Sequence, residues 1–149
     1  MSNIFNKENI FIVDEELEDK NSLFKVIAKK ASSLGYVYSE EECYRGLLAR
    51  ENQQTTGFEG GFAIPHCKNN TIKEPKLLLF KTLPIPWDSL DGQPTVFSFV
   101  LLIPEQSAKE HLQYLAKIAR SLIDQEYRQE LLVADKENIY LKVSKKLEV

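Results

Sequence analysis

Hydrophobic residues recur at two different spacings along the chain, and these spacings predict where strands and helices lie. A short apolar, β-branched run, Ile10–Val13, is typical of a strand. Between positions 23 and 34 the apolar residues recur at helical spacing, and Gly35 suits the end of that helix. A second helix is expected to begin at Ser39, because Ser39 and Glu42 form a capping box for its first backbone N–H groups.

The middle of the chain carries the strongest strand patterns. Glycines interrupt the segment 55–61, and the apolar run 62–64 that follows is short and stops at Pro65, which indicates a loop, a short strand and another loop. The segments 76–83 and 94–103 are apolar runs separated by prolines and a turn-forming Asp-Gly pair. These two segments are expected to pair in a sheet.

The last third of the chain has a helical pattern. Pro104 ends the second long strand, and Ser107 with Glu110 forms another capping box at the start of a long helix. Two shorter helices are expected after it, one over 127–133 and one over 139–147. Strands before and between helices predict a layered α/β domain. The long helix carries one apolar stripe that we expect to be buried, formed by Ala108, His111, Leu112, Leu115, Ile118, Ala119 and Leu122.

Composition narrows the class of protein. Of the 149 residues 43% are hydrophobic, and the sequence has no internal repeat and no linker-like tract. Residues 1–149 are therefore expected to form a single domain with one continuous core. The net charge of −3 comes from 19 basic and 22 acidic side chains spread along the sequence. No basic stripe is available to follow a phosphate backbone, which argues against nucleic acid as a partner.

The sequence carries no pattern for export or membrane insertion. Its first residues lack a basic start, a long apolar run and a cleavage site, so we expect no secretory signal. The apolar stretch 96–103 is too short to cross a bilayer. Two cysteines, Cys43 and Cys67, are too few for a disulfide framework. We therefore expect a soluble, cytoplasmic protein without direct membrane insertion.

Only two histidines occur in the sequence, and His66 is the first candidate for chemistry. It follows the segment 61–65, whose proline would fix the direction in which the imidazole leaves the sheet. Ligand sites gather at the ends of strands in α/β sheets, and the glycines upstream would let a phosphate approach closely. The competing interpretation is a histidine with only a structural role at a strand end.

Other candidates would complete a phosphate site. His111 lies in the first turn of the predicted long helix, where the helix dipole disfavours imidazolium, so a neutral ring could donate to a phosphoryl oxygen. The Arg50 guanidinium, at the end of the second helix, could grip phosphate with two parallel hydrogen bonds. Thr55, Thr56 and backbone amides near Gly57 could donate to the same anion. Each feature also has a structural explanation, such as a cation at a helix end or a turn cap.

Four blocks of residues, in order along the chain, form one recognisable set: Arg50-Glu51 with Thr55-Thr56-Gly57, then Gly61-Phe62-Ala63-Ile64-Pro65-His66, then Trp87 with Asp91-Gly92-Gln93-Pro94-Thr95-Val96, then Glu110-His111-Leu112 with Leu115. This set resembles the active-site signature and later blocks of fructose- and mannitol-type enzyme IIA domains of the sugar phosphotransferase system (PTS EIIA type 2). The likeness covers nearly the whole chain, and four ordered blocks are far more specific than one short motif.

The resemblance implies a three-layer α/β/α sandwich in which helices flank a small mixed β-sheet. It also implies a phosphotransferase without metal or other cofactor, in which His66 accepts a phosphoryl group and His111 and Arg50 line its pocket. The donor would be phosphohistidine on HPr, and the acceptor a thiol or imidazole on a IIB component, with the membrane component IIC reached indirectly. Glu59 departs from the family pattern, and we expect it to face solvent or the partner because an inward carboxylate would repel phosphate.

Other interpretations stay open at this stage. A regulatory, nitrogen-type IIA protein would keep the fold and the phosphohistidine but control other proteins. A structural or binding domain would use neither histidine. A Cys67 nucleophile is disfavoured because neighbouring residues of an extended chain point to opposite sides, and a zinc site from His66, Cys67 and His111 lacks the usual ligand spacing. Neither the transported sugar nor homo-oligomerisation follows from the sequence.

Overall fold

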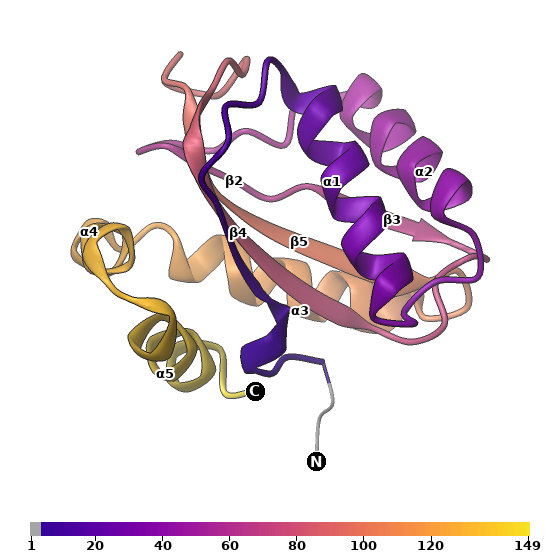
Figure 1. The fold of residues 1–149 in the computed structure, drawn as a ribbon. Coiled ribbons are helices and arrows are strands. Elements are labelled where there is room, and N and C mark those ends of the chain that lie inside the picture. Colours follow the sequence, from indigo (N-terminus) through magenta and orange to yellow (C-terminus); the bar gives the residue numbers. More distant parts are fainter. Residues whose placement is uncertain (1–3) are drawn as a thin grey trace.

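The computed structural model describes residues 4–149, with the side chains of residues 108 and 110 outside that description. Within it, a five-stranded sheet lies between two layers of helices (Figure 1). In chain order the elements are the 3-10 turn η1 (Lys7–Asn9), β1 (Ile10–Val13), α1 (Lys20–Ser33), α2 (Glu40–Gln53), β2 (Phe62–Ala63), β3 (His66–Asn69), β4 (Lys76–Ile85), β5 (Thr95–Pro104), α3 (Ala108–Ser121), α4 (Gln125–Val133) and α5 (Lys136–Leu147). Every predicted helix and strand is found.

The sheet is mixed, as the family resemblance implied. Its order is β1-β4-β5-β2, and β3 also pairs with β5. The two longest strands, β4 and β5, run antiparallel, which confirms the predicted pair. β1 runs parallel to β4, while β2 and β3 both run parallel to β5. The segment that leads to His66 therefore forms one edge of the sheet.

His66 is the first residue of β3, and the prediction of a loop at this position was wrong. Ala63 lies opposite Ser98 and His66 lies opposite Leu101, so β2 and β3 keep one register along β5. Only the hydrogen bonding is interrupted, because Pro65 has no N–H to donate. Its carbonyl still accepts from the Leu101 N–H at 3.0 Å. The edge strand thus continues through His66 and holds that residue's backbone in place.

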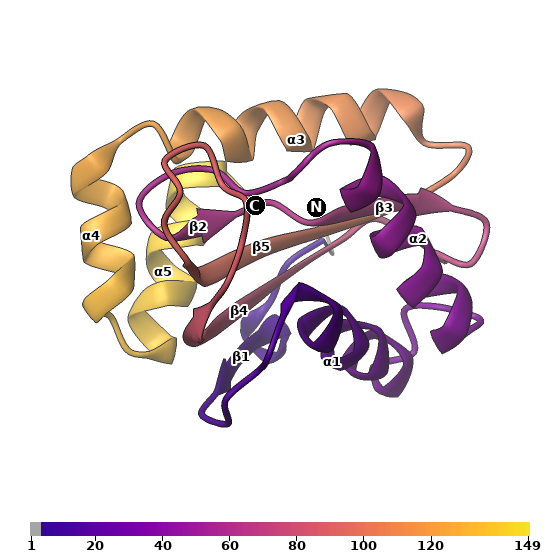
Figure 2. The same cartoon turned by 90° about the horizontal axis from the view of Figure 1, so that it is seen from above.

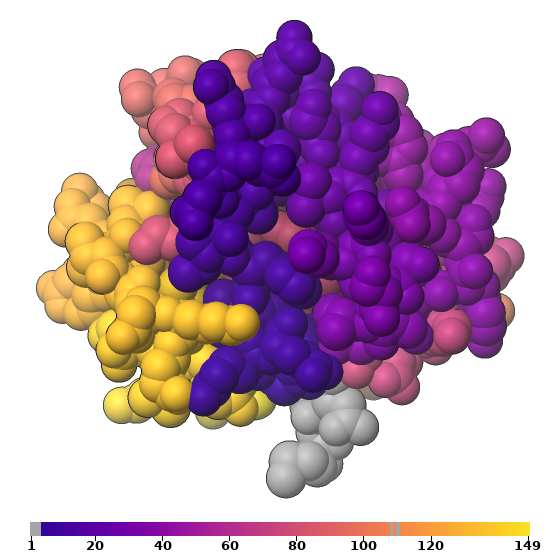
Figure 3. Space-filling view, in the orientation of Figure 1, coloured from indigo at the N-terminus to yellow at the C-terminus, as the bar shows by residue number. Residues whose placement is uncertain are grey.

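Helices cover both faces of the sheet, so the fold is a three-layer α/β/α sandwich (Figures 1 and 2). Alternate strand residues enter two cores: Leu78 and Phe80 pack with α1 and α2, whereas Leu77 and Leu79 pack with α3, α4 and α5. In Figure 3 the C-terminal residues, in yellow, lie beside the N-terminal residues, in indigo, where Lys7 pairs with Glu137. None of the described helices is long and apolar enough to cross a membrane.

The helix starts differ in part from the prediction. Ser39 caps α2 by accepting from the Glu42 N–H at 3.1 Å, but the Glu42 carboxylate pairs with Arg45 instead of closing the capping box. The Ser107 side chain makes no cap hydrogen bond with a described residue, and the Glu110 side chain lies outside the description. Leu112 is 68% exposed, so the predicted stripe of α3 is buried only over its later turns.

Candidate functional site

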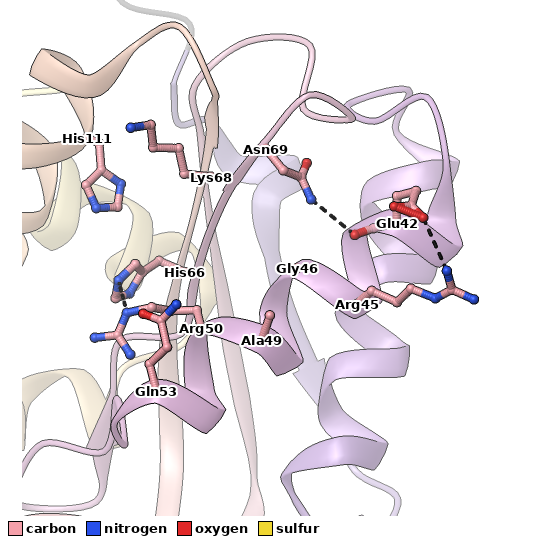
Figure 4. A pocket seen from close by; sticks show the side chains of 10 residues that line it. All are labelled: Glu42, Arg45, Gly46, Ala49, Arg50, Gln53, His66, Lys68, Asn69 and His111. Atoms are coloured by element: carbon pink, nitrogen blue, oxygen red, sulfur yellow. Dashed lines mark hydrogen bonds and ion pairs between the residues drawn. The ribbon is translucent and has the colours of Figure 1, made fainter.

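A cavity of about 590 Å³ opens where α2, β3 and α3 meet at the edge of the sheet (Figure 4). His66, Arg50 and His111, the three side chains that the sequence singled out most strongly, converge in it. It is lined by Glu42, Arg45, Gly46, Ala49, Arg50, Gln53, His66, Lys68, Asn69 and His111. Helices from both layers therefore contribute to one site around the edge strand.

The hydrogen bonds of His66 define its tautomer. Its Nδ1 lies 2.9 Å from the Ile64 carbonyl oxygen, and a carbonyl can only accept, so Nδ1 carries the proton. Its Nε2 accepts from the Nε–H of Arg50 at 2.9 Å, which requires a free lone pair there. Although His66 is only 6% exposed, it lines the open cavity. Of the two ring nitrogens, Nε2 is therefore the one whose lone pair could act as a nucleophile.

Burial keeps the His66 ring neutral. The pKa of His66 is lowered to about 4, chiefly by loss of hydration and in smaller part by the nearby charge of Arg50. The hydrogen bond to the Ile64 carbonyl acts in the opposite direction but is outweighed. A neutral imidazole with an unprotonated nitrogen is a competent nucleophile at neutral pH.

Arg50 reaches His66 because α2 lies unusually close to β3. A Cβ atom added to Gly46, one turn before Arg50, would come within 2.3 Å of Cys67 Sγ and 2.6 Å of Asn69 Nδ2. Only glycine permits this approach. The guanidinium then bonds to His66 through Nε and donates from Nη1 to the Gln54 carbonyl at 2.7 Å. Gly46 had not been singled out in the sequence, where a glycine inside a helix pattern was the available signal.

His111 lies across the cavity from Arg50. Its ring centroid is 5.3 Å from that of His66, with the rings inclined at 54°. Burial lowers the pKa of His111, and the charges of Lys68 and Arg50 lower it further, so the ring is neutral at neutral pH. Its Nδ1 is buried without a hydrogen-bond partner among the described residues. The ring is thus neutral, as expected from its sequence position, and its role as a hydrogen-bond donor to phosphate stays a prediction.

Thr55, Thr56 and Gly57 do not line the cavity, contrary to the predicted phosphoryl-binding role. The Thr56 hydroxyl donates to the buried carboxylate of Glu51 at 2.5 Å, and the Thr55 hydroxyl accepts from the Gly57 N–H at 3.0 Å. A Cβ at Gly57 would lie 2.7 Å from the Cα of Ser89, so this glycine lets two loops pack together. The groups expected to bind phosphate instead hold the loop in place.

Lys68 was missed in the sequence although the strand pattern could have revealed it. It lies two residues after His66 on β3, so the two side chains share one face of the strand. Figure 4 shows Lys68 extending on the same side as His111. Its ammonium group has no ion pair with another described residue and adds positive charge to the cavity.

The structure agrees with two further expectations, on Glu59 and on Cys67. Glu59 is exposed and faces Arg128 at 3.6 Å rather than His66. Cys67 packs with Cys43 in the α1–α2 core, on the face of β3 opposite to His66. Burial raises the pKa of both thiols to about 12. Trp87 is buried against Phe24 and donates to Glu51 at 3.1 Å, so it covers the edge of the core.

Comparison with known proteins agrees with this geometry. Residues 3–146 match the family model described as "Phosphoenolpyruvate-dependent sugar phosphotransferase system, EIIA 2". Nitrogen regulatory proteins from Pseudomonas aeruginosa and Bradyrhizobium diazoefficiens are both 40% identical to the chain. These alignments cover 57% of this chain and 56% of the Pseudomonas protein, and 81% of this chain and 79% of the Bradyrhizobium protein.

Two further proteins extend the comparison. A fructose-specific EIIA component from Haloferax volcanii is 29% identical over 83% of this chain and 80% of that protein. The crystal structure of nitrogen regulatory protein IIA-Ntr from Neisseria meningitidis superposes with a TM-score of 0.84 at 28% identity. That superposition covers 93% of this chain and 94% of the Neisseria chain. The chain is thus similar in sequence to both sugar-system and nitrogen-regulatory proteins, and similar in fold to a nitrogen-regulatory one.

Proposed function

This chain belongs to the EIIA 2 family of the phosphoenolpyruvate-dependent sugar phosphotransferase system, and we propose that residues 1–149 act as one domain that carries a phosphoryl group on Nε2 of His66. The single observation that supports this most is the tautomer of His66. Its Nδ1–H is held by the Ile64 carbonyl, and the free lone pair of Nε2 points into the cavity at Arg50. A nucleophilic atom is thus presented beside a fixed cation.

The proposed transfer is an in-line displacement. The Nε2 lone pair forms a bond to phosphorus while the bond from phosphorus to the donor nitrogen breaks, and the donor ring keeps that electron pair. Positive charge develops on the His66 ring, and the Ile64 carbonyl offsets it by accepting from Nδ1–H. Once Nε2 is bonded to phosphorus, Arg50 loses its acceptor there and lies beside the new phosphoryl oxygens.

His111 and Lys68 complete the proposed phosphoryl site. His111 supplies a neutral ring whose buried Nδ1 is unpartnered among the described residues. Lys68 adds charge on the same side of the cavity. The phosphoryl group leaves by the reverse displacement, so one geometry serves acceptance and donation. We propose phospho-HPr as the donor and a IIB component as the acceptor, with IIC contacting the sugar.

The role of the phosphoryl group downstream has two candidates. In sugar uptake, His66 passes the group through IIB for coupled transport and phosphorylation. In regulation, the phosphorylation state of His66 controls other proteins. The second candidate is favoured by similarity, because the chain is 40% identical to two nitrogen regulatory proteins and 29% identical to the fructose-specific EIIA component.

The carrier function is tested with purified components. The protein is incubated with phosphoenolpyruvate, enzyme I and HPr, and its mass is measured after neutral and after acid treatment. We expect one acid-labile phosphoryl adduct that is absent from the His66→Ala variant and from reactions without HPr. An adduct that persists in His66→Ala, or no adduct on the wild type, contradicts the proposal.

Onward transfer separates the two downstream roles. The labelled protein is mixed with fructose- or mannitol-type IIB and IIC in membrane vesicles together with the sugar. Rapid loss of label with formation of sugar phosphate supports transport. Label that remains on His66 under these conditions, while the same vesicles consume label from a known sugar-specific EIIA, supports regulation.

A further inference from the structure

Glu51 holds a buried carboxylate next to the site without lining the cavity. Its side chain is 2% exposed. It accepts from the Thr56 N–H at 3.0 Å, the Thr56 hydroxyl at 2.5 Å and Trp87 Nε1 at 3.1 Å, and it pairs with Lys20 at 2.9 Å. A buried carboxylate is costly unless its oxygens are satisfied, and here four donor groups from three segments satisfy them. Such a centre fixes the segments relative to one another.

Loop 54–57, which Glu51 holds, is connected by hydrogen bonds to Arg50 and, through Ile64, to His66. On one side, the Gln54 carbonyl accepts from Arg50 Nη1 at 2.7 Å. On the other, the Thr56 carbonyl accepts from the Ile64 N–H at 2.9 Å. The carbonyl of that same Ile64 then accepts from His66 Nδ1. Loop 54–57 therefore touches Arg50 directly and touches the hydrogen-bond partner of His66.

The loop also supports the edge strand beside Ile64. Gly57 forms an antiparallel bridge with Ala63, and the Phe58 N–H donates to the Phe62 carbonyl at 2.8 Å. The strand before His66 is thus held between β5 and this loop. The Ile64 carbonyl can fix a proton on Nδ1 only while this backbone stays in place.

We propose that Glu51 is a positioning residue that keeps His66 in the Nδ1–H tautomer, with Nε2 free, by anchoring loop 54–57 through Thr56. Its importance for transfer rests on the proposed function of His66. A carboxylate is required because its two oxygens accept from four donors at once. An amide in its place has one oxygen, and its NH₂ group would face a donor.

The test measures the tautomer without any phosphoryl donor. Nitrogen-15 chemical shifts of the His66 ring at neutral pH distinguish the Nδ1–H form from the Nε2–H form. We expect the wild type to be in the Nδ1–H form and Glu51→Gln to show a mixture. With phospho-HPr as donor, phosphorylation of Glu51→Gln should be slower by about 10²-fold, because the reacting atoms lose alignment.

Matched variants separate positioning from general stability. Glu41→Gln removes an exposed carboxylate of the same helix whose ion pair among the described residues is with Arg45, and it should leave both readouts unchanged. Thr56→Val removes the hydroxyl bond while Thr56→Ser keeps it, so only the first should change the tautomer. If Glu51→Gln does not fold, the His66 tautomer in the two Thr56 variants decides whether the loop positions His66.

The failures of the two proposals can be told apart. A lower melting temperature in Glu51→Gln or Thr56→Val, with the His66 tautomer and the phosphorylation rate unchanged, overturns the positioning role. A shifted tautomer in a protein whose wild type accepts no phosphoryl group supports the positioning role and contradicts the carrier function.

Discussion

The two helices that meet at His66 hold their side chains in different ways. On the α2 side, Arg50 makes two hydrogen bonds, its neighbour Glu51 is surrounded by donors, and Gly46 packs α2 against β3. On the α3 side, His111 has a buried Nδ1 without a partner among the described residues, and Ser107 makes no side-chain cap bond with them.

The difference assigns separate tasks to the two sides. The α2 side fixes the direction and protonation of His66, the proposed nucleophile, and such preorganisation would lower the cost of reaching the transition state. The α3 side places the neutral ring of His111 in the wall of the cavity, and its Nδ1 is held by no hydrogen bond from a described residue. Substitutions on the α2 side should therefore slow phosphoryl transfer more than substitutions on the α3 side.

Replacing Arg50 should have the largest effect. Arg50→Ala removes the cation beside Nε2, and we expect phosphorylation by phospho-HPr to slow by about 10²–10³-fold. The pKa of His66 should rise as well, because the charge of Arg50 helps to depress it. Rapid-quench labelling and NMR titration measure the two effects. Arg120→Ala, which replaces an exposed arginine of α3, is the control. Equal phosphorylation rates in the two variants would show that Arg50 plays no part in the transfer.

Acid should reveal the burial of His66. Above pH 6.5 the ring is neutral in both folded and unfolded chains, so it does not affect stability. Between pH 6.5 and about 4 the unfolded chain binds a proton that the folded one does not, so the free energy of unfolding falls as pH falls. The full loss is about 3 kcal/mol. Urea unfolding across this range should show a shallower pH dependence in His66→Gln, and parallel curves would contradict the burial effect.

Increasing the distance between α2 and β3 should have a smaller effect than removing Arg50. Gly46→Ala places a methyl group against Cys67 Sγ and Asn69, and we expect a loss of stability of about 1–3 kcal/mol. The double variant Gly46→Ala with Cys67→Ala should recover part of the loss, because the first clash disappears. Denaturant midpoints measure both. A single variant more stable than the wild type would show that the close approach is unnecessary.

The smallest effect is expected on the α3 side. His111→Ala should slow phosphoryl transfer by about tenfold, the worth of one hydrogen bond to a charged group, while leaving His66 labelled. The nitrogen-15 shifts of His66 should stay those of the wild type. Transfer to and from the variant at the wild-type rate would show that His111 plays no part. A rate reduction as large as that of Arg50→Ala would contradict the proposed difference between the two sides.

The sequence predicted the elements and the central trio because these depend on local patterns. Helical spacing located α1 and α3, and strand pairs followed from apolar runs. His66, Arg50 and His111 came from motif blocks whose order along the chain could be checked. Their convergence in one cavity depends on the fold, which the family resemblance supplied.

What the sequence did not predict depends on contacts between distant segments. The Thr56 hydroxyl looked available for phosphate because its bond to a buried carboxylate is visible only once α2 and the loop are placed together. Leu112 belonged to the apolar stripe, yet it is 68% exposed and follows His111, which lines the open cavity. The need for glycine at position 46 becomes visible only when the short distance between α2 and β3 is known.

The alternation of side chains along β3 has a chemical consequence for Cys67, the residue next to His66. Cys67 is covered by the α1–α2 core, and its pKa of about 12 leaves almost no thiolate at neutral pH. Peroxides and alkylating reagents attack thiolates, so they should react very slowly with the Cys67 sulfur. The proposed phosphoryl transfer by His66 should therefore tolerate oxidising conditions that would inactivate a protein with an accessible active-site cysteine.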